Sequence, residues 1–336
     1  MNILPPVGKS APPDSRNIYS FTSAPNKIPL RANGTNPYNQ VYLLTNNHAK
    51  KGHAYNLSFI IDKQVNNFSF NSSYTYGRSD VLFEVTGTTT PISTQWQTAE
   101  TINGKNFITP STSDNDMQHR IVVRMSKKID YAKNKTATTI TLFYNGQSGE
   151  PYSYVYNGGM INDNGSRENY DLIYIPTNND LTSMKFLPNT VGQVTYSPQQ
   201  QKDLLSDFIE SDKYLSKNRG EFAKRNGARL PFTHIVDLRL QQDFKLKIKD
   251  KIVKFSISYD VSNLTNMVNK NWGRTYFMNN DNFPLIRFAG FANTTTLIPQ
   301  YQFTPFAGKA YSLQTSMAPG NSARWISQLG LKINLN

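Results

Sequence analysis

Side chains that commonly carry out catalysis or bind metals are scarce in this 336-residue chain, which has four histidines and no cysteine. His48 and His53 flank a lysine-rich loop at residues 46–52, and His119 and His234 stand apart from them. A metal site or a nucleophile–histidine arrangement would need distant partners, which no motif marks. We therefore expect no enzyme, metal or cofactor, and we interpret the lysine-rich loop as solvated.

Oxygen ligands of the kind that calcium binds are concentrated in the string NDNGSRENYD. They are Asp163, Asn164, Glu168 and Asp171. Gly165, however, does not occupy the position that the twelve-residue calcium loop requires. A polar turn is the simpler interpretation, and a bound calcium ion stays open as the alternative.

Four aromatic residues, Trp96, Tyr152, Tyr154 and Tyr156, fall in segments that we expect to be long external loops. Exposed aromatic rings there could stack on a sugar ring or a peptide, so they are our candidate substrate contacts. The alternative is that these rings pack against one another within the loops. The sequence alone leaves both readings open.

The elements that must position these residues are strands, and the last one, RWISQLGLKINL at residues 324–335, is typical. Its alternate residues form one apolar face. The face consists of Trp325, Leu329, Leu331, Ile333 and Leu335 and is interrupted only by Ser327. This period of two predicts a strand. About ten alternating residues also suffice for a tilted strand to cross an outer membrane.

Similar alternation predicts about ten strands. They are expected at 39–46, 53–63, 68–76, 119–129, 136–144, 234–244, 252–261, 272–278, within 285–306 and at 324–335. Residues 1–38 are expected to be an irregular loop segment, and one helix is expected from Pro198 to about Tyr214, capped by Ser197. We therefore predict an all-β chain in which residues 39–336 form part of an antiparallel transmembrane β-barrel.

Loop lengths support this prediction, because membrane barrels alternate short periplasmic turns with longer external loops. The expected short turns are 64–67, 130–135, 245–251 and about 280–284. The expected long connections are 78–118, 147–233 and 307–323. The parity requires YSYVY (152–156) and DLIYIP (171–176) to lie in the external excursion. A soluble β-sandwich or propeller would explain the alternation but not the difference in loop length.

Charge and hydropathy narrow the function classes. Hydrophobic residues make up 38% and mean hydropathy is −0.54, which excludes a helical membrane protein. The net charge is +13, but the densest lysine run, Lys245 to Lys254, brackets a tight turn without a helix or aromatic platform. We interpret that run as a solvated hairpin end and expect no nucleic-acid partner. MNILPPVGKSAPPDS lacks the features of a secretory signal. An envelope location would therefore imply that this sequence is a fragment or that its start is misannotated.

Several strings resemble the barrel region of TonB-dependent receptors, specifically the Oar-like subgroup. They are NQVYLLTN, HRIVV, LFYNGQSGEPYSYVY, DLIYIP, DKYLSKNRGEFAKRNGARLPF, HIVDLRLQQDF, YDVSNLTNMVNKNWG and the closing RWISQLGLKINL. The resemblance implies a 22-stranded barrel around a plug, in the outer membrane of a Gram-negative bacterium. It also implies lipid, lipopolysaccharide, the plug and the TonB complex as partners, with an unknown substrate. The end Leu335–Asn336 departs from the family, whose final strands usually end on an aromatic residue.

Two sets of strand residues acquire expected roles from this resemblance. The residues expected to face the lumen are Arg120, Arg124, Arg239, Lys254, Asp237 and Asp260. The residues expected to lie at the membrane interfaces are Tyr55, Tyr74, Tyr76, Trp325 and Phe244. Alone, the chain would form a curved open sheet or, if 39–46 pairs with 324–335, a small closed barrel. The competing hypothesis is a soluble secreted β-sandwich that binds glycan or surface polymer.

Overall fold

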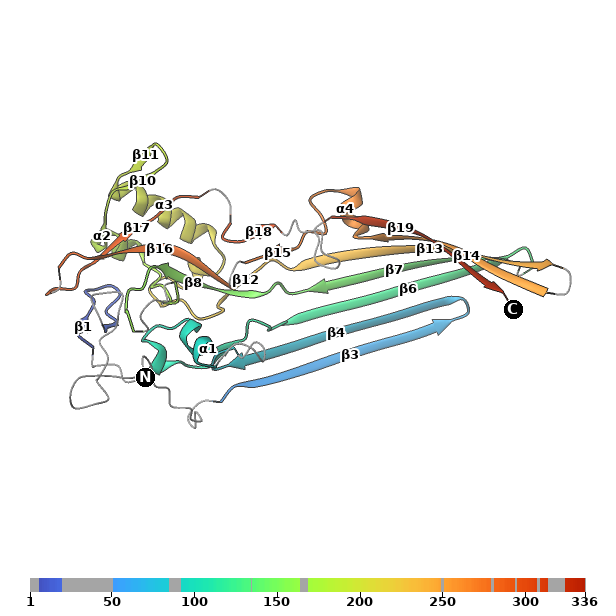
Figure 1. Cartoon of the computed structure of the whole chain (residues 1–336), viewed down its shortest axis with the longest axis horizontal. Helices are drawn as coiled ribbons and strands as arrows, with labels where there is room; N and C mark the ends of the chain where they lie inside the picture. Colours follow the sequence, from blue (N-terminus) through green and yellow to red (C-terminus); the bar gives the residue numbers. More distant parts are fainter. Residues whose placement is uncertain are drawn as a thin grey trace, which may run out of the picture.

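The computed structural model describes residues 6–19, 51–84, 92–133, 135–163, 169–248, 251–278, 281–293, 295–306, 309–313 and 324–335. The protein has two parts, a long antiparallel sheet and a compact lobe at one end of that sheet (Figure 1). None of the helices within these ranges has the length and apolar character needed to span a membrane.

The long sheet contains seven long strands and one short one. They are β3 (His53–Val65), β4 (Phe68–Val81), β5 (Ser111–Thr112), β6 (His119–Tyr131), β7 (Thr136–Gln147), β13 (Thr233–Ile248), β14 (Lys251–Ser262) and β19 (Ile326–Leu335). The long strands pair in the order β3-β4-β6-β7-β13-β14-β19, all antiparallel, and β5 pairs with the end of β4. Within the described residues this sheet is open, with β3 and β19 at its edges.

Short turns and long connections lie at opposite ends of the long sheet (Figure 1). The strand pairs β3–β4, β6–β7 and β13–β14 are each connected by only two to four residues at one end of the sheet. Asn66 adopts a φ of 49°, a left-handed conformation that asparagine tolerates better than most residues. The described parts of the longer connections, between β4 and β6, between β7 and β13 and between β14 and β19, lie at the other end (Figure 1). Because Leu335 pairs with Val253, β19 ends on the side of the short turns, as the loop parity predicts.

The lobe is built around a mixed five-stranded sheet in the order β12-β8-β16-β17-β9. Its strands are β8 (Pro151–Asn157), β9 (Lys185–Phe186), β12 (Ala228–Arg229), β16 (Asn282–Phe291) and β17 (Pro299–Gln302). The other helices and strands are α1 (Ile92–Thr98), α2 (Asn178–Ser183), α3 (Pro198–Ser211), α4 (Leu264–Val268), the β10 (Asn189–Val191) and β11 (Val194–Tyr196) hairpin, and the pair β15 (Tyr276–Phe277) and β18 (Ser312–Leu313). Two 3₁₀ turns, Lys105–Phe107 and Leu215–Lys217, complete the described elements.

Helix α3 begins where the sequence predicts and ends a few residues earlier than expected. The Ser197 hydroxyl accepts from the Gln200 backbone N–H, and the Gln200 side chain accepts from the Ser197 N–H, which forms a capping box. Leu205 and Ile209 are fully buried against the lobe sheet. Leu204, which precedes Leu205, is exposed.

Two expectations about the strands are wrong, and a third cannot be compared with the described residues. Residues 282–291 and 299–302 supply β16 and β17 to the lobe sheet, so the described residues 281–284 form no short turn of the long sheet, and β19 pairs with β14 instead. The physical reason is that Leu285 and Ile286 are both buried, as in a strand covered on two faces, whereas a half-exposed strand buries alternate residues. The expected strand at 272–278 shrinks to β15. The expected strand at 39–46 lies outside the described residues.

The N-terminal residues 6–19 form a small hairpin of β1 (Gly8–Lys9) and β2 (Asn17–Ile18) that packs into the lobe. Arg16 is buried there, and its Nε lies 2.6 Å from Asp14 Oδ1. Its Nη2 donates to the Leu172 carbonyl at 2.7 Å, and its guanidinium lies 5.3 Å from the centre of the Tyr156 ring. Part of the segment expected to be irregular is therefore an anchored element of the lobe core.

Candidate functional site: an apolar sheet face and a basic cleft

Strand register places one set of alternate residues from all seven long strands on the same face of the long sheet. Phe59 of β3 lies opposite Tyr74 of β4, which lies opposite Ile121 of β6. At the other edge, Ile257 of β14 lies opposite Leu331 of β19. This apolar face also includes Leu57, Ile61, Met125, Ile140, Leu142, Leu240, Phe255, Tyr259, Leu329 and Ile333. The strand alternation predicted from the sequence is thus one continuous surface.

This apolar face has little covering it among the described residues. Phe59 is 60% exposed, Ile257 is 41% exposed and Leu331 is 68% exposed. Monomeric soluble proteins rarely expose contiguous apolar patches of more than a few hundred Å². A face that spans seven strands therefore needs an apolar environment or a partner.

Tyrosine–histidine pairs mark the end of the apolar face nearest the lobe. The hydroxyl of Tyr74 lies 2.9 Å from His119 Nδ1, and the hydroxyl of Tyr144 lies 2.8 Å from His234 Nδ1. A Cβ at Gly146 would overlap the Tyr144 hydroxyl, so this glycine leaves room for the ring to reach His234. Two of the four histidines therefore sit in an aromatic belt, which the apolar-face positions of His119 and His234 could have indicated.

A second aromatic group marks the end of the face near the short turns. Phe244 stacks on Phe255 with ring centres 4.5 Å apart, and Tyr131 lies in the same region. Along β13 about ten residues separate His234 from Phe244, which is roughly 34 Å of strand. A strand tilted by about 40° would hold the two belts about 26 Å apart, close to the apolar band of outer-membrane barrels.

The five aromatic residues expected at interfaces follow this arrangement. Tyr55, Tyr74, Tyr76 and Phe244 belong to strands of the long sheet, and their register puts them on the apolar face. Tyr55 and Tyr76 also contact each other, with ring centres 6.2 Å apart. Trp325 directly precedes β19 and is exposed.

The opposite face of the long sheet is polar. By register it carries Arg120, Arg124, Asp237, Arg239, Lys254 and Asp260, which are the six residues expected to face a lumen. Arg239 lies opposite Asp260, and its Nε is 3.6 Å from a carboxylate oxygen of that residue. Asp237 accepts a hydrogen bond from the backbone N–H of Asn263 at 2.7 Å. The long sheet therefore has one apolar face and one polar face.

The three tyrosines expected to contact substrate are buried in the lobe core. Tyr152, Tyr154 and Tyr156 lie side by side on β8 and are at most 2% exposed. The Tyr154 hydroxyl donates to Asp212 at 2.8 Å, and the Tyr156 hydroxyl donates to Asp14 at 3.0 Å. The expectation that they are exposed is wrong, because the residues between them, such as Ser153, are also buried and the strand is covered on both faces.

Trp96 lies on α1, apart from these tyrosines. Its Nε1 donates to the Lys105 carbonyl at 2.8 Å, which fixes the indole to the lobe. The indole keeps part of its surface exposed and does not line the basic cleft described below. The structure therefore does not bring the four expected aromatic residues together into one site.

The carboxylates considered for calcium have protein partners. Asp163 accepts from the backbone N–H of Lys105 at 2.5 Å, and Asp171 accepts from two backbone N–H groups at 2.7 and 3.0 Å. Burial raises the pKa of Asp171 to about 6. Asn164 and Glu168 lie outside the described residues. Among the residues that are described, no group of three or more potential ligands could hold a metal ion.

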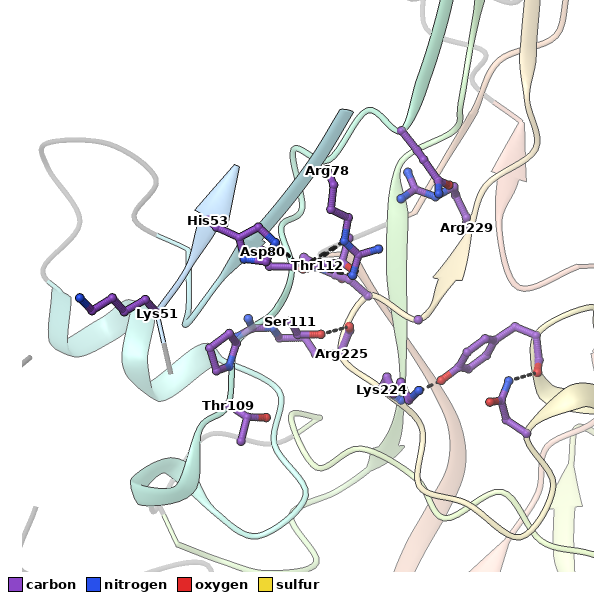
Figure 2. A pocket seen from close by; sticks show the side chains of 16 residues that line it. Lys51, His53, Arg78, Asp80, Thr109, Ser111, Thr112, Lys224, Arg225 and Arg229 are labelled. Atoms are coloured by element: carbon purple, nitrogen blue, oxygen red, sulfur yellow. Dashed lines mark hydrogen bonds and ion pairs between the residues drawn. The ribbon is translucent and has the colours of Figure 1, made fainter. Parts of the chain in front are cut away.

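A basic cleft of about 800 Å³ lies where the long sheet meets the lobe (Figure 2). Its walls come from the lobe end of β3 and β4, from residues 109–112 and from residues 214–229. The charged lining residues are Lys51, Arg78, Lys224, Arg225, Arg229 and one carboxylate, Asp80, with His53 beside it. No sequence motif marks this cleft, although the density of Lys and Arg between residues 213 and 229 is a signal that could have indicated it.

Two of these cations, Arg78 and Arg229, form ion pairs with carboxylates among the described residues. Arg78 lies 2.8 Å from Asp80, and Arg229 lies 2.6 Å from Asp116. Figure 2 shows the Arg78 side chain directed toward Asp80. Arg225 is 6% exposed and donates to two backbone carbonyls, of Val81 and Leu82, without a carboxylate in contact.

Comparisons with protein-family models, with curated proteins and with solved structures found no match to this chain.

Proposed function

We propose that the long sheet is part of the wall of an outer-membrane β-barrel and that the chain belongs to a TonB-dependent receptor. The observation that carries this proposal is the exposed apolar face bounded by two aromatic belts. The sequence strings that resemble the barrel region of such receptors support it independently. The sheet would form the wall, and the lobe and its connections would gate access to substrate.

Removal of the apolar face from water is energetically favourable. Fully burying a Leu, Ile or Phe side chain is worth about 1.5–3 kcal/mol. More than ten such side chains lie at least partly exposed on this face, Leu329 and Leu331 being the most exposed of those on β19. Lipid acyl chains between the belts would satisfy them, while the tyrosines and histidines would lie at the interfaces.

Orientation follows from the loops. The short turns and the end of β19 would lie on the periplasmic side, and the lobe would lie outside the cell. Lipid and lipopolysaccharide would contact the apolar face. A plug would contact the polar face, near Arg239 and Asp260, and would couple to the TonB complex.

The competing hypothesis, a soluble secreted β-sandwich that binds glycan or surface polymer, requires a second layer over the apolar face. It predicts that Phe68, Tyr74 and Ile257 are packed in a core. All three are at least 36% exposed, and the described residues supply no such layer. This exposure favours the membrane proposal.

Site-directed labelling in lipid tests the proposal directly. The chain contains no cysteine, so single cysteines at Phe59, Ile257 and Leu331 can each carry a fluorophore without background labelling. After refolding into vesicles with brominated acyl chains, we expect strong quenching at these three positions. The matched controls are Ser58→Cys, Ser258→Cys and Lys332→Cys, whose side chains lie on the polar face.

Two outcomes would contradict the membrane role. One is equal quenching of neighbouring positions on the two faces. The other is a chain that remains a compact monomer in water without detergent. Heat-modifiable mobility in gels, which depends on a folded barrel, provides a rapid preliminary check.

A further inference from the structure

Several cations of the basic cleft have no ion-pair partner among the described residues. Lys51, Lys224 and Arg225 form no ion pair with any residue that the structure describes. Figure 2 shows the Lys51 side chain extending away from the Arg78 and Arg229 side chains, so it belongs to the rim. Lys224 and Arg225 therefore supply the unneutralised charge on the lobe side.

The segment that presents these two cations is held rigidly. Asn226, with a φ of 55°, is buried, and its Nδ2 donates to the Thr112 carbonyl at 2.8 Å. The backbone N–H of Lys224 donates to the Tyr214 hydroxyl at 2.8 Å, and the Arg225 carbonyl accepts from the Ser111 hydroxyl at 2.6 Å. Preorganisation of this kind lowers the entropy cost of binding.

The position of Arg225 is costly without a negatively charged partner. Burial lowers the pKa of its guanidinium, and the negative charges of Glu100, Asp114 and Glu84 partly oppose that effect. Burying a cation without a carboxylate in contact is unfavourable. A ligand anion in the cleft would compensate this cost.

Size and polarity restrict the ligand. A volume of about 800 Å³ lies in the range of small-molecule sites and exceeds what a bare ion needs. The lining is mostly charged or hydrogen-bonding, which favours a hydrophilic ligand over an apolar one. A single carboxylate is satisfied by one arginine, as Asp80 is by Arg78. Several cations from separate segments suit a group of higher charge, such as phosphate, which carries about −1.5 to −2 as a monoester.

We propose that the basic cleft binds a phosphorylated ligand of about sugar-phosphate size, with Lys224 and Arg225 contacting the phosphate and Arg78 and Arg229 lining the opposite wall. Lysine acts on phosphate as a point charge, and arginine adds directed N–H donors. The phosphate could belong to a free solute or to a lipid headgroup, because His53 and Arg78 lie next to the tyrosine–histidine belt. The inference rests on the proposed function only for the location of the ligand outside the cell.

Binding is tested on protein refolded in detergent micelles, where the result does not depend on insertion into a bilayer. Isothermal titration calorimetry with glucose 6-phosphate should give saturable binding, and glucose should give none. Lys224→Gln should weaken binding about tenfold, the effect of losing one charged hydrogen bond. The control Lys185→Gln removes the same charge from an exposed site elsewhere on the lobe and should change nothing.

A second titration separates the two sources of phosphate. If micelles containing lipid A bind with the same sensitivity to Lys224→Gln while glucose 6-phosphate does not, the phosphate is lipid-borne. Binding of neither probe overturns the proposal, as does equal weakening by Lys224→Gln and Lys185→Gln. If Arg225→Gln does not fold because it releases Val81 and Leu82, Arg225→Lys retains the charge and should bind more weakly than wild type.

Discussion

Strands β3 and β8 have similar sequence patterns but opposite environments. In β3, Tyr55, Leu57 and Phe59 alternate with polar residues, and in β8 three tyrosines alternate with Ser153 and Val155. Phe59 is 60% exposed, whereas Tyr154 is completely buried. The difference lies in the residues between the aromatic ones, which are exposed in β3 and buried in β8.

Alternation of residue types therefore defines a strand and its two faces, but it does not show what covers those faces. Most long strands exceed the lobe strands in length, as β13 with 16 residues exceeds β8 with 7, although β19 and β16 both have 10 residues. A long strand can keep one face free over its whole length. A short strand in the lobe is covered by the connections on both sides.

Truncation of one aromatic ring in each sheet tests the difference between the two environments most strongly. Tyr154→Ala should destabilise the lobe by about 3–5 kcal/mol, because it creates a cavity beside Tyr214 and Phe208 and removes the bond to Asp212. Phe59→Ala in detergent should cost much less. The measurement is denaturant unfolding followed by tryptophan fluorescence, and equal losses would refute the distinction between the two sheets.

The buried pair in the N-terminal hairpin provides the next largest effect. Arg16→Met should cost about 3–5 kcal/mol at most, because it leaves Asp14 charged and buried. The double variant Asp14→Asn with Arg16→Met should recover much of this loss. Thermal unfolding of the single and double variants measures it, and a neutral Arg16→Met would show that the hairpin is not part of the lobe core.

A pH effect should be confined to the lobe. Burial raises the pKa of Glu100 to about 7, although Lys105 and Arg225 oppose the shift. The folded state therefore keeps Glu100 protonated at higher pH than the unfolded state does. The contribution of this proton to the free energy of unfolding is fully present below about pH 4.5 and is lost as the pH rises through about 7. Glu100 keeps part of its surface exposed, so we expect about 2 kcal/mol, below the full linkage value.

Glu100→Gln isolates this contribution from other titrating groups. The unfolding free energy of the variant should depend less on pH than that of wild type between pH 5 and 8. Wild type and variant should converge at low pH, where Glu100 is protonated. Parallel curves for the two proteins would contradict the raised pKa.

The smallest effect is expected in the aromatic belt. Tyr144→Phe removes the hydrogen bond to His234 but keeps the ring, and should cost about 0.5–1.5 kcal/mol. Tyr74→Phe should have a similar effect through His119. Guanidinium unfolding in lipid vesicles measures both losses. A loss as large as that of Tyr154→Ala would mean that the belt is packed like the lobe core.

The sequence predicted the all-β class and the strands of the long sheet through their period of two, and it predicted α3 through Ser197 and Pro198. It could not place β16, because adjacent apolar residues such as Leu285 and Ile286 suit a buried strand in any sheet. It could not predict the burial of Tyr154 either, because that burial depends on which segments cover β8. The basic cleft depends on contacts between residues more than 100 positions apart, such as Arg225 and Val81.

The number of long strands in the described part of the sheet, seven, is odd, and this fixes the direction of its edges. Strands β3 and β19 both run from the lobe toward the short turns. They cannot pair antiparallel with each other, and two copies side by side in the same orientation would meet in a parallel seam. An antiparallel barrel therefore requires an odd number of additional strands between these two edges, whichever residues supply them.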